Sequence, residues 1–242
     1  MKAALFYGGQ DIRVTELPDP TPGPGEVLVR VRAAGICGSD LHGYRAGAAA
    51  ARREPGTSGH ELAGVVVGLG AGVTTPTLGQ RVAIEPLHLI GCGACRWCRA
   101  GQYEMCPTRG VVAGARRHSS GFAELDVAPV ANCVPLPEAI SLEEAAILDV
   151  YACAVHAAQR VPAGPMDDVA IIGTGPIGLA AAEMYRALGV RRVIVLGRRD
   201  AALQKALAFG TDVTVNVATT DPVQAVRDLT GGLGAQVVIE AV

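Results

Sequence analysis

Four cysteines lie within a single short segment, and no other feature limits the fold of this chain so strongly. They are Cys92, Cys95, Cys98 and Cys106. At this spacing one loop can wrap a tetrahedral Zn(II) with a thiolate on every vertex. The segment has few large apolar side chains, so metal binding would supply folding free energy. We therefore predict a structural zinc lobe over residues 91–107 that leaves no coordination position open to a substrate.

Other uses of these cysteines fit the sequence less well. An iron–sulfur cluster also accepts four thiolates, but the spacing differs from both ferredoxin patterns. Disulfides are not expected, because the seven cysteines occur in a chain whose N-terminus carries no export signal. A chance grouping of four buried cysteines is the remaining alternative.

Charge and hydropathy exclude some classes of partner. The chain has 242 residues, of which 21 are basic and 23 acidic, and its formal net charge is -2 without a block of like charges. Such a surface favours neither nucleic acid nor an anionic membrane. The first apolar run ends at Gly8, and no later run is long enough to span a bilayer. We expect a cytoplasmic protein that acts on a small molecule.

Residues 1–150 have the pattern of a β-rich domain. Runs of β-branched residues occur at 27–31 and 64–67, and turns rich in Pro and Gly separate the runs. This pattern predicts a compact β-barrel. The Ala- and Arg-rich stretch 45–57 and the cysteine lobe depart from the pattern, and we expect both at the surface.

Residues 151–242 alternate between strand and helix patterns. Just before them, Ser141 followed by Glu144 predicts a capping box and a helix over 142–159. The expected strands are 169–172, 193–196, 213–215 and 236–239. Helical segments between them indicate a parallel α/β unit. A complete doubly wound nucleotide fold has about six strands, so we expect only the N-terminal half of a Rossmann-type domain.

A glycine fingerprint stands between the first strand and the first helix of this unit. The residues assigned to dinucleotide binding are Gly173, Gly175, Pro176, Ile177 and Gly178. In this context backbone amides can approach a pyrophosphate at the helix N-terminus. The alternative is a glycine-rich turn without a ligand, which the agreement of strand, motif and helix disfavours.

The end of the next strand indicates which dinucleotide is bound. NAD-binding folds place an acid there to accept hydrogen bonds from the ribose, whereas this chain has Gly197, followed by Arg198 and Arg199. Arginine side chains can donate bidentate hydrogen bonds to a 2′-phosphate. We therefore predict that NADP is preferred over NAD. The alternative is two solvated arginines, with Asp200 as a displaced ribose ligand.

Cys37 and His60 each stand in a glycine-flanked turn, but a lone cysteine and a lone histidine are more often core or surface residues. The run from Gly59 to Gly70 resembles the zinc signature of medium-chain alcohol dehydrogenases. The Cys37 segment, the cysteine lobe and the glycine fingerprint follow the order of that family. The resemblance spans essentially the whole chain and is closest to threonine, sorbitol, butanediol and bacterial secondary-alcohol dehydrogenases.

The resemblance implies a catalytic zinc in addition to the structural one. The ligands implied are Cys37, His60 and Asp149, together with Glu61, which can either bind the metal directly or lie just behind the ligands. An open position on such a zinc binds the alcohol oxygen and lowers its pKa, after which hydride passes to the nicotinamide. Ser39 resembles the hydroxyl that takes the substrate proton, and His42 resembles the histidine that passes it on. Cys153, one helical turn after Asp149, is an alternative ligand.

The resemblance also implies an α/β architecture, in which a GroES-like β-barrel catalytic domain over 1–150 precedes an incomplete Rossmann-type domain over 151–242. A full-length enzyme of this kind is expected to form a homo-oligomer, a dimer or a tetramer. Two other functions stay open. One is a zinc-free quinone or enoyl reductase, which would lack these ligands, and the other is a truncated, non-catalytic interaction or nucleotide-binding fragment.

Overall fold

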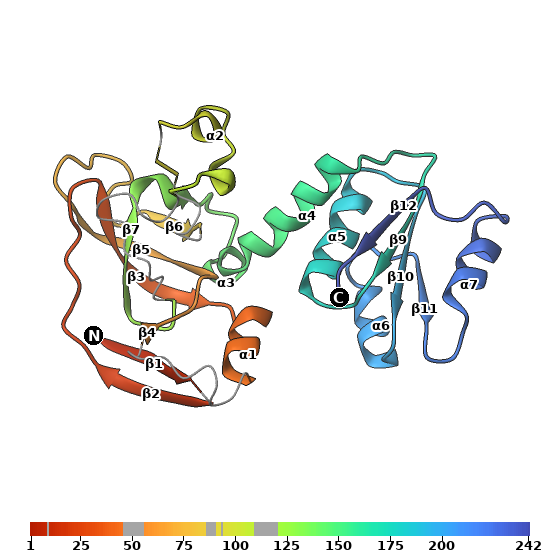
Figure 1. Ribbon diagram of the computed structural model, residues 1–242, viewed down its shortest axis with the longest axis horizontal. Coiled ribbons are helices and arrows are strands. Elements are labelled where there is room, and N and C mark those ends of the chain that lie inside the picture. The colour runs from red at the N-terminus through yellow and green to blue at the C-terminus, as the bar shows by residue number, and fades with distance from the viewer. Residues whose placement is uncertain (9, 46–55, 86–90, 93, 109–120) are drawn as a thin grey trace. The chain divides into compact units, whose positions relative to one another are not determined.

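The computed structural model describes residues 1–8, 10–45, 56–85, 91–92, 94–108 and 121–242. The chain forms two compact units, Met1–Asp149 and Val150–Val242 (Figure 1). Most of the expected surface stretch at 45–57 lies outside the described residues. No helix among the described residues is long and apolar enough to cross a membrane.

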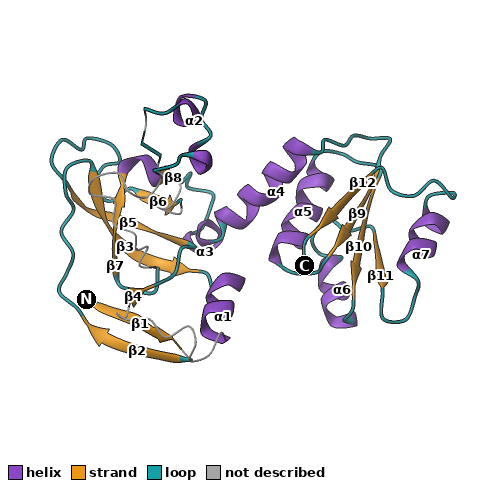
Figure 2. Cartoon of the chain, viewed as in Figure 1, coloured by secondary structure: helices purple, strands orange, loops and turns teal. Residues whose placement is uncertain are grey.

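The first unit is built on two antiparallel sheets, shown as orange arrows in Figure 2. The larger sheet has the order β7-β3-β5-β6-β8 and the smaller has the order β2-β1-β4. The strands of the larger sheet are β3 (Glu26–Ala34), β5 (Leu62–Leu69), β6 (Arg81–Ile84), β7 (Leu125–Pro129) and β8 (Cys133–Pro135). The strands of the smaller sheet are β1 (Lys2–Gly8), β2 (Asp11–Glu16) and β4 (Gly56–Thr57). The two β-rich runs expected at 27–31 and 64–67 lie within β3 and β5.

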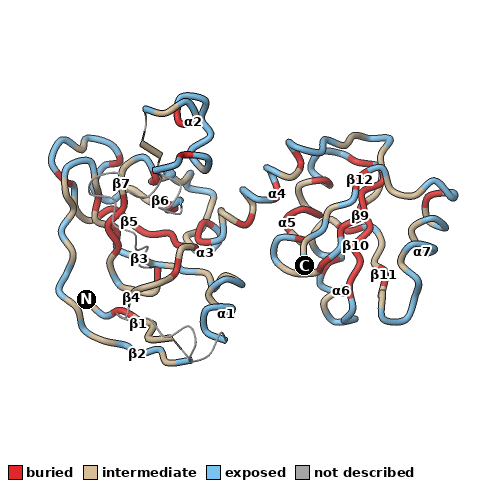
Figure 3. Tube along the Cα trace, viewed as in Figure 1, coloured by how far each residue is buried: buried red, intermediate tan, exposed pale blue. Residues whose placement is uncertain are grey.

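The core of the first unit follows from alternation along these strands. Val27 and Val29 of β3 are buried, whereas Arg30 and Arg32 of the same strand are exposed. Successive side chains of a strand point to opposite faces, so one face of the sheet supplies a continuous apolar surface. The buried segments appear red along β3 and β5 in Figure 3.

Short helices connect and flank the strands of the first unit. They are α1 (Gly38–Arg45), α2 (Arg96–Arg99), η3 (Tyr103–Met105), η4 (Val130–Asn132) and α3 (Leu142–Ala146). The predicted capping box is confirmed, because Ser141 Oγ accepts from the Glu144 amide while the Glu144 carboxylate accepts from the Ser141 amide. Two otherwise orphaned N–H groups are thereby satisfied at the start of α3.

The single helix expected over 142–159 is wrong, because the segment forms two helices, α3 and α4 (Leu148–Arg160). Ile147 ends α3 with φ of -105° and ψ of 21°, outside the helical region. Its amide donates to the carbonyl of Glu144, three residues back, so the last turn is tightened. Sequence periodicity does not register this change in backbone direction.

The second unit is a parallel sheet in the order β11-β10-β9-β12. Its strands are β9 (Asp168–Ile172), β10 (Arg192–Gly197), β11 (Val213–Asn216) and β12 (Val237–Glu240). Its helices are α5 (Pro176–Ala187), α6 (Asp200–Ala206) and α7 (Pro222–Leu229). The expected parallel α/β architecture is confirmed.

Both faces of this sheet are buried. Val169, Ile171 and Val195 pack with α5 on one face. Ala170, Ile194 and Leu196 pack with residues of α7 on the other. This two-sided burial explains why the strands are nearly continuous apolar runs in the sequence.

Candidate functional site

The pairing of β3 with β5 brings Cys37, His60 and Glu61 together. Ala34 at the end of β3 pairs with Leu62 at the start of β5. Cys37 follows β3 by three residues, and His60 and Glu61 immediately precede β5, so both turns lie at the same edge of the sheet. One ligand atom from each of the three residues lies within 4.8 Å of the other two. Thiolate, imidazole and carboxylate are the donors that zinc prefers, so this set fits Zn(II).

Glu61 is held in a tight enclosure. Glu61 is only 6% exposed. Its backbone carbonyl accepts a hydrogen bond of 2.8 Å from the Gly35 amide. A Cβ on Gly35 would lie 2.1 Å from Glu61 Oε2, so only glycine leaves space for the carboxylate. Burial, followed by the nearby negative charge of Asp149, raises the pKa of Glu61. A cation at this position would relieve both effects.

Asp149 stands beside this group at the start of α4. Its Oδ2 lies 4.0 Å from Nε2 of His60, and both side chains are about one quarter exposed. The three mutually close ligand atoms do not include one from Asp149. Cys153 lies in the second unit and is exposed. The structure thus places Asp149, the predicted fourth ligand, near His60.

Asp40 connects the two turns, and sequence reasoning missed it. Its Oδ2 accepts from the Cys37 amide at 3.0 Å. Its Oδ1 accepts from Ser58 Oγ at 3.1 Å, two residues before His60. The carboxylate thus fixes the Cys37 turn against the His60 turn. The position of Asp40 in the first turn of α1 was a signal that could have indicated such a role, because acids there accept backbone N–H groups.

Ser39 and His42 both lie on α1, and both are exposed. Residues three apart in a helix are neighbours on its surface. The structure therefore places the two on one side of a helix that begins directly after Cys37.

The structure also brings the four cysteines of the lobe together. Four sulfur atoms, one each from Cys92, Cys95, Cys98 and Cys106, lie within 4.8 Å of one another. Cys95 caps α2, which carries Cys98, and Cys106 follows η3. Cys98 and Cys106 are buried although the lobe has little apolar core.

Hydrogen bonds lower the pKa of two of the four lobe thiols, those of Cys92 and Cys106. Backbone amides, first that of Ala94 and then that of Cys95, lower the pKa of Cys92 to about 6. A hydrogen bond from Thr108 is the main cause of the lowered pKa of Cys106. Thiolates are the form that binds metal. Four converging sulfurs with N–H donors around them fit a closed tetrahedral zinc site.

The glycine fingerprint forms the turn between β9 and α5. Gly173 donates to the Leu196 carbonyl of β10 at 2.9 Å. A Cβ on Gly178 would lie 2.3 Å from the Gly173 carbonyl oxygen, so close packing of helix on turn requires glycine there. A Cβ on Gly175 would meet no atom within 4 Å. Gly175 therefore borders open space at the start of α5, which begins with Pro176 and Ile177, and this arrangement fits a pyrophosphate group.

Gly197 ends β10 and is buried, whereas Arg198 and Arg199 are exposed. Arg199 precedes α6 as its N-cap residue. Asp200, the alternative ribose ligand, accepts a hydrogen bond of 2.6 Å from Asn216 Nδ2 through its Oδ1. The structure thus places both arginines directly after the end of β10, and a hydrogen bond joins Asp200 to Asn216 at the end of β11.

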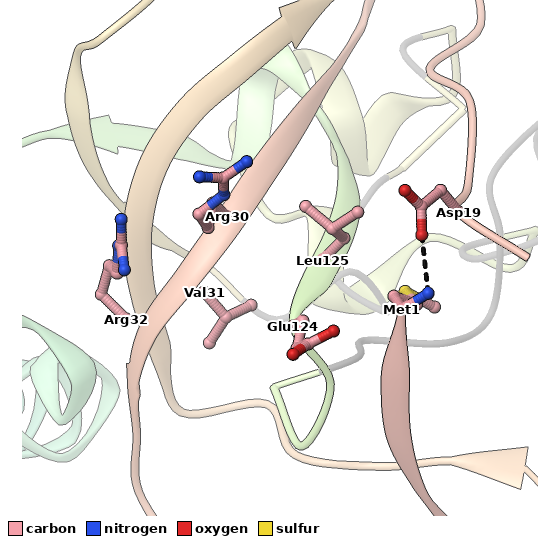
Figure 4. A pocket seen from close by; sticks show the side chains of 7 residues that line it. All are labelled: Met1, Asp19, Arg30, Val31, Arg32, Glu124 and Leu125. Atoms are coloured by element: carbon pink, nitrogen blue, oxygen red, sulfur yellow. Dashed lines mark hydrogen bonds and ion pairs between the residues drawn. The ribbon is translucent and has the colours of Figure 1, made fainter. Parts of the chain in front are cut away.

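A separate hollow of about 490 Å³ lies in the first unit. Figure 4 shows Arg30 and Arg32 on one side of it and the ion pair of the Met1 amino group with Asp19 on the other. None of the predicted site residues lines it.

Comparison with known families identifies the chain. Residues 23–138 match the family described as alcohol dehydrogenase GroES-like domain, and residues 176–242 match the family described as zinc-binding dehydrogenase. The chain belongs to the zinc-dependent medium-chain dehydrogenase/reductase family. The predicted fold class, a GroES-like domain followed by a partial Rossmann-type domain, is confirmed.

Two curated relatives illustrate the similarity. An L-threonine 3-dehydrogenase of Saccharopolyspora erythraea is 40% identical over 232 residues, which cover 95% of this chain and 66% of the relative. A sorbitol dehydrogenase of Bacillus subtilis is 33% identical over 242 residues, which cover 99% of this chain and 68% of the relative. The chain thus spans about two thirds of the length of these proteins.

Solved structures show the same fold with either dinucleotide. An alcohol dehydrogenase from Escherichia coli CFT073, complexed with NADH, has a TM-score of 0.86 at 32% identity. The match covers 100% of this chain and 69% of the alcohol dehydrogenase. A zinc-binding dehydrogenase from Sinorhizobium meliloti 1021, bound to NADP, has a TM-score of 0.85 at 31% identity. The match covers 99% of this chain and 69% of the dehydrogenase.

Proposed function

We propose that this chain carries the metal and dinucleotide sites of an oxidoreductase that transfers hydride between an alcohol and NADP. The substrate class is a small secondary alcohol, a polyol or a hydroxy amino acid. The observation that carries the proposal is the convergence of Cys37, His60 and Glu61 at one sheet edge. The names of the threonine and sorbitol dehydrogenase relatives support the substrate class.

Two zinc ions per chain are part of the proposal. Cys37, His60 and Glu61 would hold the catalytic one, with Asp149 beside them, and the four cysteines of the lobe would hold the structural one. Zn(II), when bound at the first site, supplies a Lewis acid that polarises an alcohol or carbonyl oxygen. The buried Glu61 and the neighbouring Asp149 supply negative charge that favours retention of a cation there.

The proton released from an alcohol is assigned to α1. Ser39 would accept the substrate proton at its hydroxyl oxygen while releasing its own hydroxyl proton toward His42, and His42 would pass a proton on to water. This assignment is supported by their common side of α1 and by the exposure of His42. An imidazole is suited to this relay, because one ring nitrogen can accept a proton while the other donates one.

The preference for NADP rests on the end of β10. Gly197 places no carboxylate there, and Arg198 and Arg199 offer guanidinium groups to a 2′-phosphate. Gly173, Gly175 and Gly178 shape the turn that would receive the pyrophosphate. We also propose that the full-length protein is a homo-oligomer.

Enzyme assays test the proposal. The purified chain, and a full-length form if the gene encodes one, would be incubated with NADP and butan-2-ol, sorbitol or threonine while the absorbance of NADPH is followed. We expect reduction of NADP, loss of that activity in Cys37→Ser and His60→Ala, and a lower kcat/KM with NAD. Equal kcat/KM with NAD and NADP would contradict the cofactor assignment. A full-length form without turnover on any alcohol, together with retained structural zinc, would instead favour a non-catalytic zinc-stabilised protein.

A further inference from the structure

Thr174 fills the space next to the strand end at which nucleotide-binding folds recognise ribose. The amide of Gly173 bonds to the carbonyl of Leu196, and this contact holds the glycine turn against the end of β10. Thr174 follows in the turn and is half-buried, and Gly197 follows in the strand and is buried. The two residues therefore meet although they are far apart in the sequence.

The space between them is too small for a side chain. A Cβ on Gly197 would lie 2.7 Å from Cγ2 of Thr174 and 3.1 Å from Cδ2 of Leu203. Carbon atoms pack at about 3.5–4.0 Å, so these contacts are repulsive. Leu203 is 4% exposed and cannot withdraw into solvent. Thr174 is β-branched and stiff at χ1, so it also yields only at a cost.

We infer that Thr174 is a second determinant of dinucleotide specificity. This inference rests on the proposed function and deepens it. An acid at position 197 would accept hydrogen bonds from the ribose of NAD, but its Cβ would collide with Thr174. Thr174 thus confines position 197 to glycine, and the strand end is left to Arg198 and Arg199 and to a ligand that bears a 2′-phosphate.

The nearest carboxylate does not substitute for the missing acid. Asp200 is bonded through Oδ1 to Asn216 Nδ2 at 2.6 Å. Asn216 ends β11, and its carbonyl and side chain also accept from the amides of Thr220 and Ala218. The Asp200 carboxylate is thereby drawn toward β11.

Two series of variants of the whole chain test the inference. The first is Gly197→Ala, Thr174→Ala and the double variant, measured by thermal unfolding. We expect Gly197→Ala to lower Tm by about 3 °C or more through overpacking, and the addition of Thr174→Ala to restore most of the loss. Thr174→Ala alone is the control and should change Tm by less than the Gly197→Ala variant does.

The second series introduces aspartate instead of alanine in place of Gly197. The Kd values of NAD⁺ and NADP⁺ are measured by calorimetry. Gly197→Asp alone should weaken NADP⁺ without a gain in NAD⁺ affinity. Gly197→Asp with Thr174→Ala should bind NAD⁺ about tenfold more tightly than Gly197→Asp alone, about 1.4 kcal/mol.

The outcomes separate the steric step from the proposed function. If Gly197→Ala has the wild-type Tm, or if Gly197→Asp binds NAD⁺ as tightly as its double variant, Thr174 is not a determinant. If the wild-type chain binds neither dinucleotide, the proposed function and the specificity both fail. Recovery of the Tm of Gly197→Ala by Thr174→Ala would still show that residues 174 and 197 are in contact.

Discussion

The space around the Glu61 carboxylate is the most sensitive single point of the metal site. Gly35→Ala would place a Cβ 2.1 Å from Glu61 Oε2, so the carboxylate must leave its present position beside Cys37 and His60. We expect this variant to lose about one zinc per chain while the lobe keeps its own. Gly38→Ala is the matched control, because a Cβ there meets no atom within 4 Å. Equal metal content in the two variants would be the contrary result.

Cys133 provides a residue-scale test of burial. Desolvation, with a smaller effect of Asp126, raises the pKa of its thiol to about 12. The neutral thiol is thus favoured in the folded state, so stability should fall as the pH rises above about 8.5, where the unfolded thiol ionises. At pH 8 the thiolate fraction is about a thousandfold lower than for an unperturbed cysteine.

Alkylation followed by peptide mass spectrometry measures this difference. Iodoacetamide should leave Cys133 unmodified in the native chain and modify it after unfolding. The exposed Cys153 is the internal control and should react in both states. Rapid native alkylation of Cys133 would mean that its thiol is not held neutral.

Some site residues could be predicted from the sequence and others could not. The spacing of the lobe cysteines was sufficient to predict their grouping, because all four lie in one loop. Cys37 and His60 were assigned only through the family resemblance, since their proximity depends on the pairing of β3 with β5. Asp40 and Thr174 were missed because their partners, Ser58 and Gly197, are distant in the sequence.

At the scale of elements, the capping box of α3 has a measurable pH dependence. Hydrogen bonds from the Ser141 hydroxyl and amide lower the pKa of Glu144. The stabilisation is therefore present above the unfolded pKa of about 4.3 and is lost as the pH falls through the lowered folded value. Ser141→Ala should move the pKa of Glu144 back toward its ordinary value.

Carboxyl NMR titration of the folded chain checks this expectation. Ser141→Thr is the control, because threonine keeps the capping hydroxyl and should preserve the lowered pKa. A pKa of Glu144 that is the same in Ser141→Ala and in the wild type would show that the capping box does not form in solution.

The elements were predictable where local and long-range preferences agree. The β9 strand, the glycine turn and α5 were expected because apolar run, turn chemistry and helix pattern coincide. The break at Ile147 between α3 and α4 was not expected, because residues 142–160 have a helical composition throughout. The tightened turn at Ile147 is a property of the backbone that no side-chain pattern signals.

At the scale of the whole molecule, we assign different roles to the two metal sites: one stabilises the cysteine lobe and the other is the proposed catalytic site. The four cysteines converge within one loop and form a closed set of donors. Cys37, His60 and Glu61 come from two turns that a sheet brings together. Loss of the site formed by Cys37, His60 and Glu61 should therefore leave the fold largely intact.

The zinc content of the chain tests directly whether it has two separate zinc sites. Elemental analysis would be carried out on the wild-type chain, Cys37→Ser and Cys95→Ser after exhaustive dialysis against metal-free buffer. We expect about two zinc ions per chain in the wild type and about one in Cys37→Ser, with an unchanged circular dichroism spectrum in the latter. Cys95→Ser should lose the lobe zinc. A wild-type chain with one zinc, unaffected by Cys37→Ser, would contradict the assignment of a catalytic metal site.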